Sequence, residues 1–247
     1  MIRFILALLF AVIALILSVP VWLIVRLIGH FRPETEELIA LGFVRFAFSV
    51  IVWLSGAKVT TIGYENVPTD RPVLYIGNHR SYFDILISGR KLYRPTAYIA
   101  KKDFEHIPIL CLWMKSLRCL FLDREDLRQG LKTVLTAIDY LKSNSRSVYV
   151  YPEGTRNKTD APLLPFKEGT MKISTKSGAP IIPVAISGSK DVFEAQFPKL
   201  RPAKVVIRYG APIYPDQLTG DDLKFIGKYT ANIIEKMLEE NEAILRQ

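Results

Sequence analysis

Apolar residues gather at the amino terminus of the chain. Residues 4–25 carry no charge, and Ser18 and Pro20 are the only two that are not apolar. A helix of this length extends about 33 Å, enough to reach across a ~30 Å hydrocarbon core. The stretch is too long for the apolar part of a cleaved signal peptide, and no small-x-small cleavage site follows it. We therefore expect a membrane helix that Pro20 kinks or breaks near Val19.

A second apolar stretch covers residues 38–57 and carries one charge, Arg45. Between the two stretches lies a charged segment that contains Arg26, His30, Arg32, Pro33, Glu34, Glu36 and Glu37. The pattern predicts a helical hairpin in residues 1–57 that anchors the protein to a membrane. More arginines follow the first stretch than precede it, so the positive-inside rule places the segment after Arg26 in the cytoplasm. We expect the hairpin to enter one leaflet or cross once, leaving the rest of the chain on the cytoplasmic face.

The remaining residues, 58–247, alternate between short β-branched or aromatic runs and helical patterns. The runs that predict strands are 58–63, 72–77, 96–100, 118–123, 147–151, 181–187 and 204–209. Strands that alternate with helices imply an α/β domain, with a largely parallel central sheet flanked by helices. The sequence thus divides into an anchor and one α/β domain.

Three helices are predicted after the middle of the chain. The clearest covers residues 125–143, where Leu127, Leu131, Val134, Ile138 and Leu141 recur at helical spacing and are expected to pack in the core. Another follows Phe166. The last is expected to open at Thr219, with Asp222 completing a capping-box-like start.

Charge narrows the class of partner. The chain has 33 Lys and Arg against 24 Asp and Glu, a net charge of +9. Residues 1–57 contribute four Arg and three Glu, so the α/β domain is basic and should be drawn to anionic lipid headgroups. We find no basic stripe, zinc-finger spacing or RNP-like motif, and we expect no nucleic-acid partner. His30 and His106 have no companions at metal-ligand spacing, and Cys111 and Cys119 are expected to be buried free thiols.

Polar clusters follow four of the predicted strands. They are residues 78–84, 101–103, 123–126 and 152–156. Because ligands bind beyond the carboxyl ends of the strands in such sheets, these clusters are the candidate site.

His79 and Asp84 are the candidate catalytic pair. If His79 precedes a helix, Asp84 in the first helical turn can reach back to one ring nitrogen and leave the other as a base. The same spacing also fits a capping aspartate beside a surface histidine. Ser81 lies between them, but the chain has no G-x-S-x-G elbow, so we interpret Ser81 as a helix-start residue rather than a nucleophile.

Four ordered segments resemble a known family. They are NHRSYFD at 78–84, FLDR at 121–124, YPEGTR at 151–156 with FKEG at 166–169, and PIIPVAISG at 180–188. In this order they resemble the four blocks of the phospholipid and glycerol acyltransferases, and more narrowly the bacterial 1-acylglycerol-3-phosphate acyltransferases. One departure is that Arg118 stands where that family commonly has a glycine before the second block.

The resemblance implies a role for each matching residue. His79 would be the general base and Asp84 would orient it, while Pro183 would help to shape the acyl-binding side. The residues implied to hold the glycerol-phosphate headgroup are Lys101, Arg124, Glu153, Gly154, Thr155 and Arg156.

The sequence and the resemblance together predict a membrane-bound O-acyltransferase. It would move a fatty acyl chain from acyl-CoA or acyl carrier protein, as co-substrate, to the sn-2 hydroxyl of lysophosphatidic acid and so form phosphatidic acid. Neither a metal nor a bound cofactor is implied. The protein is expected to be located at the inner membrane. Three alternatives stay open: another acceptor such as glycerol 3-phosphate or a different lysophospholipid, a non-catalytic lipid-binding module, and a thioesterase that acylates Ser81.

Overall fold

A seven-stranded mixed sheet forms the centre of the protein in the computed structural model, which describes residues 1–246. The strands are β1 (Lys58–Ile62), β2 (Leu74–Gly77), β3 (Thr96–Lys101), β4 (Leu120–Leu122), β5 (Ser147–Val150), β6 (Ile181–Ser187) and β7 (Lys204–Tyr209). Their spatial order is β1-β7-β6-β2-β5-β3-β4. β7 pairs antiparallel with β6 and parallel with β1, while the other five strands are parallel. The predicted strands and the largely parallel sheet are confirmed.

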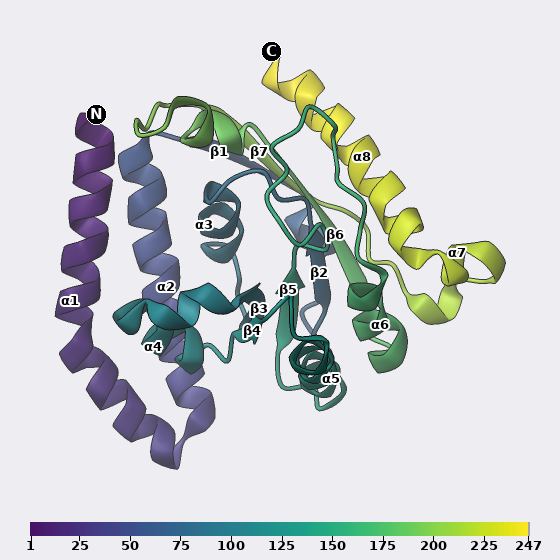
Figure 1. The fold of residues 1–247 in the computed structure, drawn as a ribbon, viewed down its shortest axis with the longest axis horizontal. Coiled ribbons are helices and arrows are strands. Elements are labelled where there is room, and N and C mark those ends of the chain that lie inside the picture. The colour runs from purple at the N-terminus through teal and green to yellow at the C-terminus, as the bar shows by residue number, and fades with distance from the viewer. Residues whose placement is uncertain (247) are drawn as a thin grey trace.

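Helices cover both faces of the sheet (Figure 1). One face carries α1 (Ile2–Phe31), α2 (Pro33–Ser55), α3 (Phe83–Gly89) and α4 (Pro108–Ser116). The other carries α5 (Leu127–Lys142), α6 (Glu168–Ser177) and α8 (Ile226–Leu245), with the short α7 (Gly220–Lys224) before it. Side chains alternate between these faces along each strand, so Tyr75 packs on the hairpin side and Ile76 on the α8 side.

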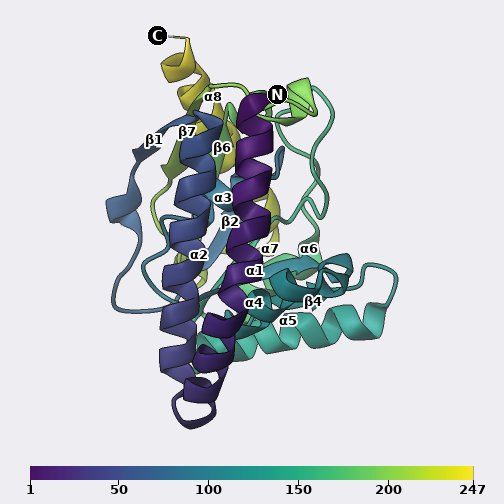
Figure 2. The same cartoon turned by 90° about the vertical axis from the view of Figure 1, so that its left-hand side faces the viewer.

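The amino-terminal hairpin is present as two antiparallel helices that lie side by side (Figure 2). The first helix does not break at Pro20, which was one of the two outcomes expected there. α1 runs through Pro20 without interruption, and its lower part bends (Figure 1). Both helices are long and apolar enough to cross a membrane, and most of their side chains are not covered by the rest of the protein.

Buried charges fix the turn end of the hairpin to the α/β domain. The Glu36 side chain is 1% exposed, accepts a hydrogen bond from the Ser116 hydroxyl at 2.8 Å and pairs with Arg26 at 3.2 Å. Glu37 pairs with Arg118 at 3.2 Å and with Arg146 at 2.7 Å. Because isolated buried carboxylates are costly, these cations and hydroxyls bind the hairpin to the domain.

The opposite end of the hairpin also touches the domain. The ring of Phe4 stacks on that of Phe193 with centroids 5.8 Å apart. A side chain at Gly56 would meet Pro202 at 3.1 Å. The hairpin therefore lies along the α/β domain rather than extending away from it.

Arg118 adopts the backbone conformation that the family's glycine would favour. Its φ of 55° lies in the left-handed region, which is strained for a side chain with a Cβ. The Arg118 side chain reaches Glu37 and, at 3.5 Å, Glu36. At this departure from the family pattern the chain therefore has a left-handed residue whose side chain contacts the hairpin.

Two helix predictions need correction. Leu127 and Leu131 were expected in the core but are 88% and 60% exposed, because α5 begins before the sheet covers it, and its first buried residue is Thr133. The last helix is divided: α7 ends at Lys224, the backbone turns at Phe225, and α8 follows. Thr219 makes no side-chain cap.

Candidate active site

Asn78 fixes the chain where β2 ends. Its amide nitrogen donates to the carbonyl of Ile186 at 2.9 Å, and the amide of Ile186 donates back to its Oδ1 at 2.8 Å. The buried side chain thus acts as one more rung between β2 and β6. The next residue, His79, therefore leaves the sheet from a rigid position.

His79 and Asp84 meet as the spacing predicted. Asp84 lies in the first turn of α3, fully buried, and its Oδ2 is 3.0 Å from Nδ1 of His79. The same oxygen accepts hydrogen bonds from the backbone amides of Arg80 and Ser81, each at 2.7 Å. These bonds hold the carboxylate against Nδ1 and leave Nε2 as the ring nitrogen that can act as a base.

Further contacts to the ring face and to the backbone of His79 hold the imidazole in place. Its ring stacks on Tyr151 at 4.2 Å, and burial raises the pKa of that phenol well above its usual range. The amide of His79 donates to Oε1 of Glu153 at 2.7 Å, and its carbonyl accepts from Asn157 at 2.7 Å. With a side chain only 14% exposed, His79 has a defined orientation.

Glu153 connects the histidine loop to the segment before α6. One carboxylate oxygen accepts from the His79 amide, and the other accepts from the Leu164 amide at 2.9 Å. Burial raises the pKa of this carboxyl, although both hydrogen bonds oppose the shift. Because backbone donors already engage both oxygens, the geometry favours a positioning role over contact with a headgroup.

Glu194 joins the site although no pattern in the sequence singled it out. Its Oε2 accepts from the Ser81 hydroxyl at 2.5 Å, and its Oε1 accepts from the Tyr82 amide at 2.8 Å. Ser81 Oγ also accepts from the Phe83 amide at 2.9 Å, which makes it the helix-start residue that we expected. Glu194 lies 113 residues beyond Ser81, and such a contact leaves no local signal.

Arg156 lies beside the same loop. It pairs with Oε1 of Glu194 at 3.2 Å, donates to the Tyr82 hydroxyl at 3.1 Å and lies over the Tyr82 ring at 3.8 Å. Its side chain is 24% exposed, so the ion pair is open to solvent on one side.

The other residues of the third block lie close by. Gly154 has a φ of 71°, and a Cβ there would come within 2.9 Å of Nζ of Lys167. Lys167, in the FKEG segment, is thus a second cation near this turn that was not singled out from the sequence. Thr155 is exposed.

Three predicted site residues take part in none of the contacts described above. Arg124 follows β4 and is exposed, and within residues 1–246 it makes no hydrogen bond. Lys101 ends β3 and pairs with Asp103. Lys101, Arg124 and His79 all follow the carboxyl ends of their strands. However, β5 lies between β2, which precedes His79, and the strands β3 and β4, which precede Lys101 and Arg124. Pro183 is buried in the middle of β6, where its carbonyl accepts from Gly210 at 2.8 Å, and its acyl-binding role stays a prediction.

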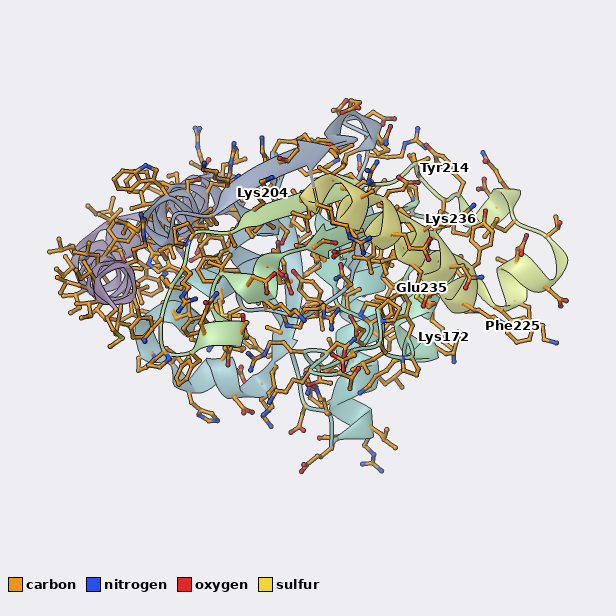
Figure 3. The ribbon with its side chains drawn as sticks, turned by 90° about the horizontal axis from the view of Figure 1, so that it is seen from above. Lys172, Lys204, Tyr214, Phe225, Glu235 and Lys236 are labelled. Atoms are coloured by element: carbon orange, nitrogen blue, oxygen red, sulfur yellow. The ribbon has the colours of Figure 1, made fainter. Side chains whose placement is uncertain are left out.

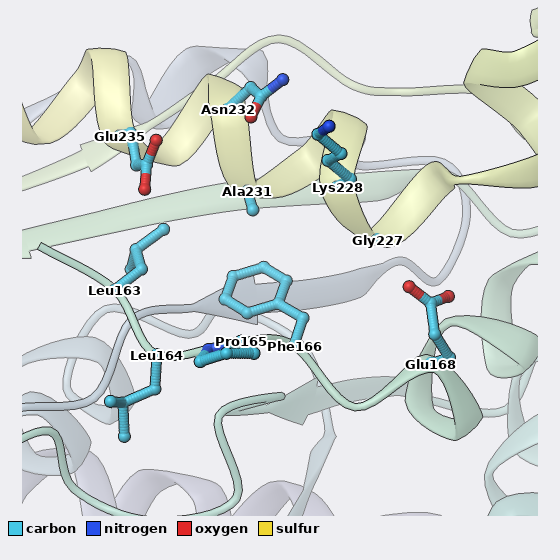
Figure 4. A pocket seen from close by; sticks show the side chains of 10 residues that line it. All are labelled: Leu163, Leu164, Pro165, Phe166, Glu168, Gly227, Lys228, Ala231, Asn232 and Glu235. Carbon is cyan, nitrogen blue, oxygen red and sulfur yellow. The ribbon is translucent and has the colours of Figure 1, made fainter.

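Two cavities border α8, and His79 lines neither. One of about 390 Å³ lies between α8 and residues 163–166, with the side chains of Leu163 and Phe166 pointing toward α8 (Figure 4). Leu164 belongs to the same segment, and its amide binds Glu153. The other cavity has a volume of about 760 Å³, and Arg80 and Ser187 line it. Lys204 on β7 and Glu235 on α8 line it as well (Figure 3). The first cavity is linked to the histidine loop through Leu164 and Glu153, and the second borders Arg80 of the loop itself.

Comparisons with known proteins identify the family to which the chain belongs. The family model described as "Acyltransferase" matches residues 58–187, just over half of the chain. The 1-acyl-sn-glycerol-3-phosphate acyltransferase of Saccharomyces cerevisiae is 29% identical over 196 residues, covering 79% of this chain and 63% of its own length. The protein of the same name from Haemophilus influenzae is 28% identical over 204 residues, covering 81% and 82%.

A solved structure extends the likeness to the hairpin. The crystal structure of the 1-acyl-sn-glycerophosphate (LPA) acyltransferase from Thermotoga maritima has a TM-score of 0.75 and 25% identity, and the match covers 98% of both chains. The matched family region spans β1 to β6 and contains the His79–Asp84 pair and the Glu153 turn. On these matches, the chain belongs to the acyltransferase family.

Proposed function

We propose that the protein acylates the sn-2 hydroxyl of lysophosphatidic acid with a thioester donor and so forms phosphatidic acid. The contact between His79 Nδ1 and Asp84 Oδ2 carries the proposal, because it leaves Nε2 as a base, while Arg156 supplies a cation against Tyr82 of the same loop. The names of the relatives support the choice of acceptor.

The reaction needs one base and good positioning. Nε2 of His79 takes the proton as the acceptor oxygen attacks the thioester carbonyl. A C–O bond forms, the C–S bond breaks, and the imidazolium returns the proton to the leaving thiolate. Asp84 stabilises the imidazolium, and base catalysis of this kind contributes roughly 10²–10⁴-fold.

The acceptor phosphate would be held by cations at the sheet edge. Arg156 would exchange Glu194 for the phosphate through its planar fork, with Arg124 and Lys101 contributing from the neighbouring strands. Glu153, Gly154 and Thr155 shape this turn. The donor is acyl-CoA or acyl carrier protein, acting as a co-substrate, and no metal or bound cofactor is part of the proposal.

The hairpin would anchor the protein in one leaflet, at the cytoplasmic face of the inner membrane. Support comes from its two ends, which both touch the α/β domain, at Ser116 and at Phe193. A hairpin held along the domain in this way favours entry into one leaflet over a crossing of the bilayer. Its exposed apolar side chains would instead lie among lipid tails, where the acceptor is dissolved.

The test is acyl transfer by the purified full chain in phospholipid vesicles. We expect His79→Ala to lose at least about 10²-fold in rate while retaining vesicle binding. Unchanged turnover by that variant would overturn the mechanism and favour a lipid-binding module.

Acceptor specificity is tested separately, with lysophosphatidic acid, glycerol 3-phosphate and a phosphate-free monoacylglycerol. Equal rates with the phosphate-free acceptor would contradict the role given to Arg156. Release of free fatty acid with an acyl group trapped on Ser81 would indicate a thioesterase.

A further inference from the structure

Helix α5 presents a row of leucines to solvent. Leu127, Leu131 and Leu135 are 88%, 60% and 52% exposed. Since residues four apart lie on one face of a helix, the three side chains form a continuous apolar strip about two turns long. Scattered exposed leucines need no explanation, but an aligned strip on a single helix does.

The strip cannot be hidden by rotation of the helix. On the inner side, Gln129 donates to the carbonyl of Phe121 and accepts from the amide of Asp123 at 2.8 Å. Thr133 donates to the same carbonyl at 3.2 Å. Asp126 caps the helix by accepting from two backbone amides. These bonds fix which face of α5 is turned outward.

Two cations border the leucine strip, and the strip begins close to the end of the sheet at which the active site lies. Arg128 and Lys132 follow the leucines along one side of the helix and are both exposed. α5 begins just after β4, at the sheet edge that carries His79, and its free end projects beyond the body below α4 (Figure 2). The strip therefore lies at the same edge as the reacting groups.

We propose that the leucine strip of α5 is a second membrane contact, which inserts into the headgroup layer of an anionic bilayer. Leucines in a row with a basic border are the pattern of helices that lie in a membrane interface. The basic charge of the α/β domain complements anionic lipid, and the hairpin supplies a first contact on the same chain. The inference rests on the proposed function, because that function places the acceptor in the bilayer. Contact at both the hairpin and α5 would fix how the active-site edge faces the lipid.

The direct test uses a fluorophore whose emission reports polarity. It is attached to Leu131→Cys, or to the control Lys236→Cys on α8 (Figure 3), in a full-length Cys111→Ser and Cys119→Ser background. The protein is reconstituted into vesicles of phosphatidylethanolamine and phosphatidylglycerol. We expect a blue shift and quenching by brominated lipid at position 131, with neither at position 236.

Three outcomes would overturn the proposal. The label at position 131 could stay as open to aqueous iodide as the label at position 236. Its blue shift could scale with the protein-to-lipid ratio, which would indicate a second copy of the chain. The shift could also require added acyl carrier protein, which would make the strip a donor-docking surface.

A kinetic test separates this inference from the proposed function. The triple variant Leu127→Gln, Leu131→Gln and Leu135→Gln should lose roughly tenfold in rate on long-chain acceptor in vesicles, equivalent to about 1.4 kcal/mol. Its rate on a short-chain, water-soluble lysophosphatidic acid in detergent should be unchanged. The matched control, Leu223→Gln with Phe225→Gln, removes exposed apolar side chains elsewhere and should leave both rates unchanged. Equal loss in both assays would overturn the inference, whereas wild-type protein inactive in both would overturn the proposed function.

Discussion

At the scale of single residues, the site depends on carboxylates that hold other groups in place. Asp84 holds the imidazole and two backbone amides with one oxygen, and Glu153 holds the amide of His79. Glu194 holds the Ser81–Tyr82 loop and Arg156 together. Most of these contacts join backbone to carboxylate, so they define geometry rather than bind substrate.

Removing Glu194 should therefore lower turnover without touching the reacting atoms. We expect Glu194→Ala to reduce kcat roughly tenfold, because the loop between His79 and Asp84 loses two hydrogen bonds and Arg156 loses its carboxylate partner. Glu194→Gln keeps an acceptor for the Tyr82 amide and should recover most of kcat. Steady-state kinetics on both variants check this. A change confined to the KM for the acceptor would instead show that Glu194 acts only through Arg156.

Sequence reasoning could predict His79 and Asp84 because they are neighbours along the chain. A side chain in the first turn of a helix has few places to reach other than the residues just before that helix. Glu194 reaches the same loop from a distant segment, and the fold alone brings it there. For Glu153 the sequence gives the right neighbourhood, but its contacts with two backbone amides depend on where the loop at Leu164 lies.

At the scale of elements, periodicity identifies a helix face but not what covers it. Ile138 and Leu141 of α5 are buried as predicted, whereas Leu127 and Leu131, at the same spacing, are exposed. The difference arises because the helix extends beyond the sheet at its start. Strand ends were predictable to within two residues because β-branched and aromatic runs stop at polar clusters.

The turn before β4 permits a test of backbone strain. Arg118→Ala and Arg118→Gly both remove the ion pair with Glu37, but only glycine relieves the φ of 55°. We expect the glycine variant to exceed the alanine variant in free energy of unfolding by about 1 kcal/mol. Thermal unfolding in detergent measures this, and equal stability of the two would show that the turn relaxes to a negative φ.

The contribution of Glu153, which connects two loops, to the free energy of unfolding should depend on pH. Burial raises the pKa of its carboxyl above the ordinary 4.5, so above pH 4.5 the folded protein binds more protons here than the unfolded chain. Its contribution to stability is therefore greatest at low pH and falls as pH rises through this window. The unfolding temperature of wild type should show this fall relative to Glu153→Gln. Parallel pH profiles of the two proteins would contradict it.

At the scale of the whole molecule, the hairpin and the α/β domain form one body. Strand composition does not predict strand order, and nothing local indicates that β7 is antiparallel to β6. Nor does the charge of the hairpin turn reveal its partners: Glu36 meets Ser116 only because α4 packs against α1 and α2. These features depend on contacts between distant segments.

This arrangement makes a prediction about membrane topology. A cysteine at Glu34, in the hairpin turn, should be modified by an impermeant maleimide from the same side of the membrane as a cysteine at Lys236 in the α/β domain. The physical reason is the bonding of the neighbouring Glu36 to Ser116. Labelling of inside-out and right-side-out vesicles, with Cys111 and Cys119 replaced by serine, checks it. Modification from opposite sides would show that α2 crosses the bilayer.

The rung that Asn78 forms with Ile186 implies an order of events during synthesis. A growing chain that has reached only residue 180 already contains His79, Asp84 and Glu153, but it lacks β6, which fixes the end of β2, and Glu194, which fixes the loop. The active site is therefore complete only after most of the chain has been synthesised. The hairpin is made first, so under the proposed function the newborn protein would meet the membrane before it could acylate a lipid.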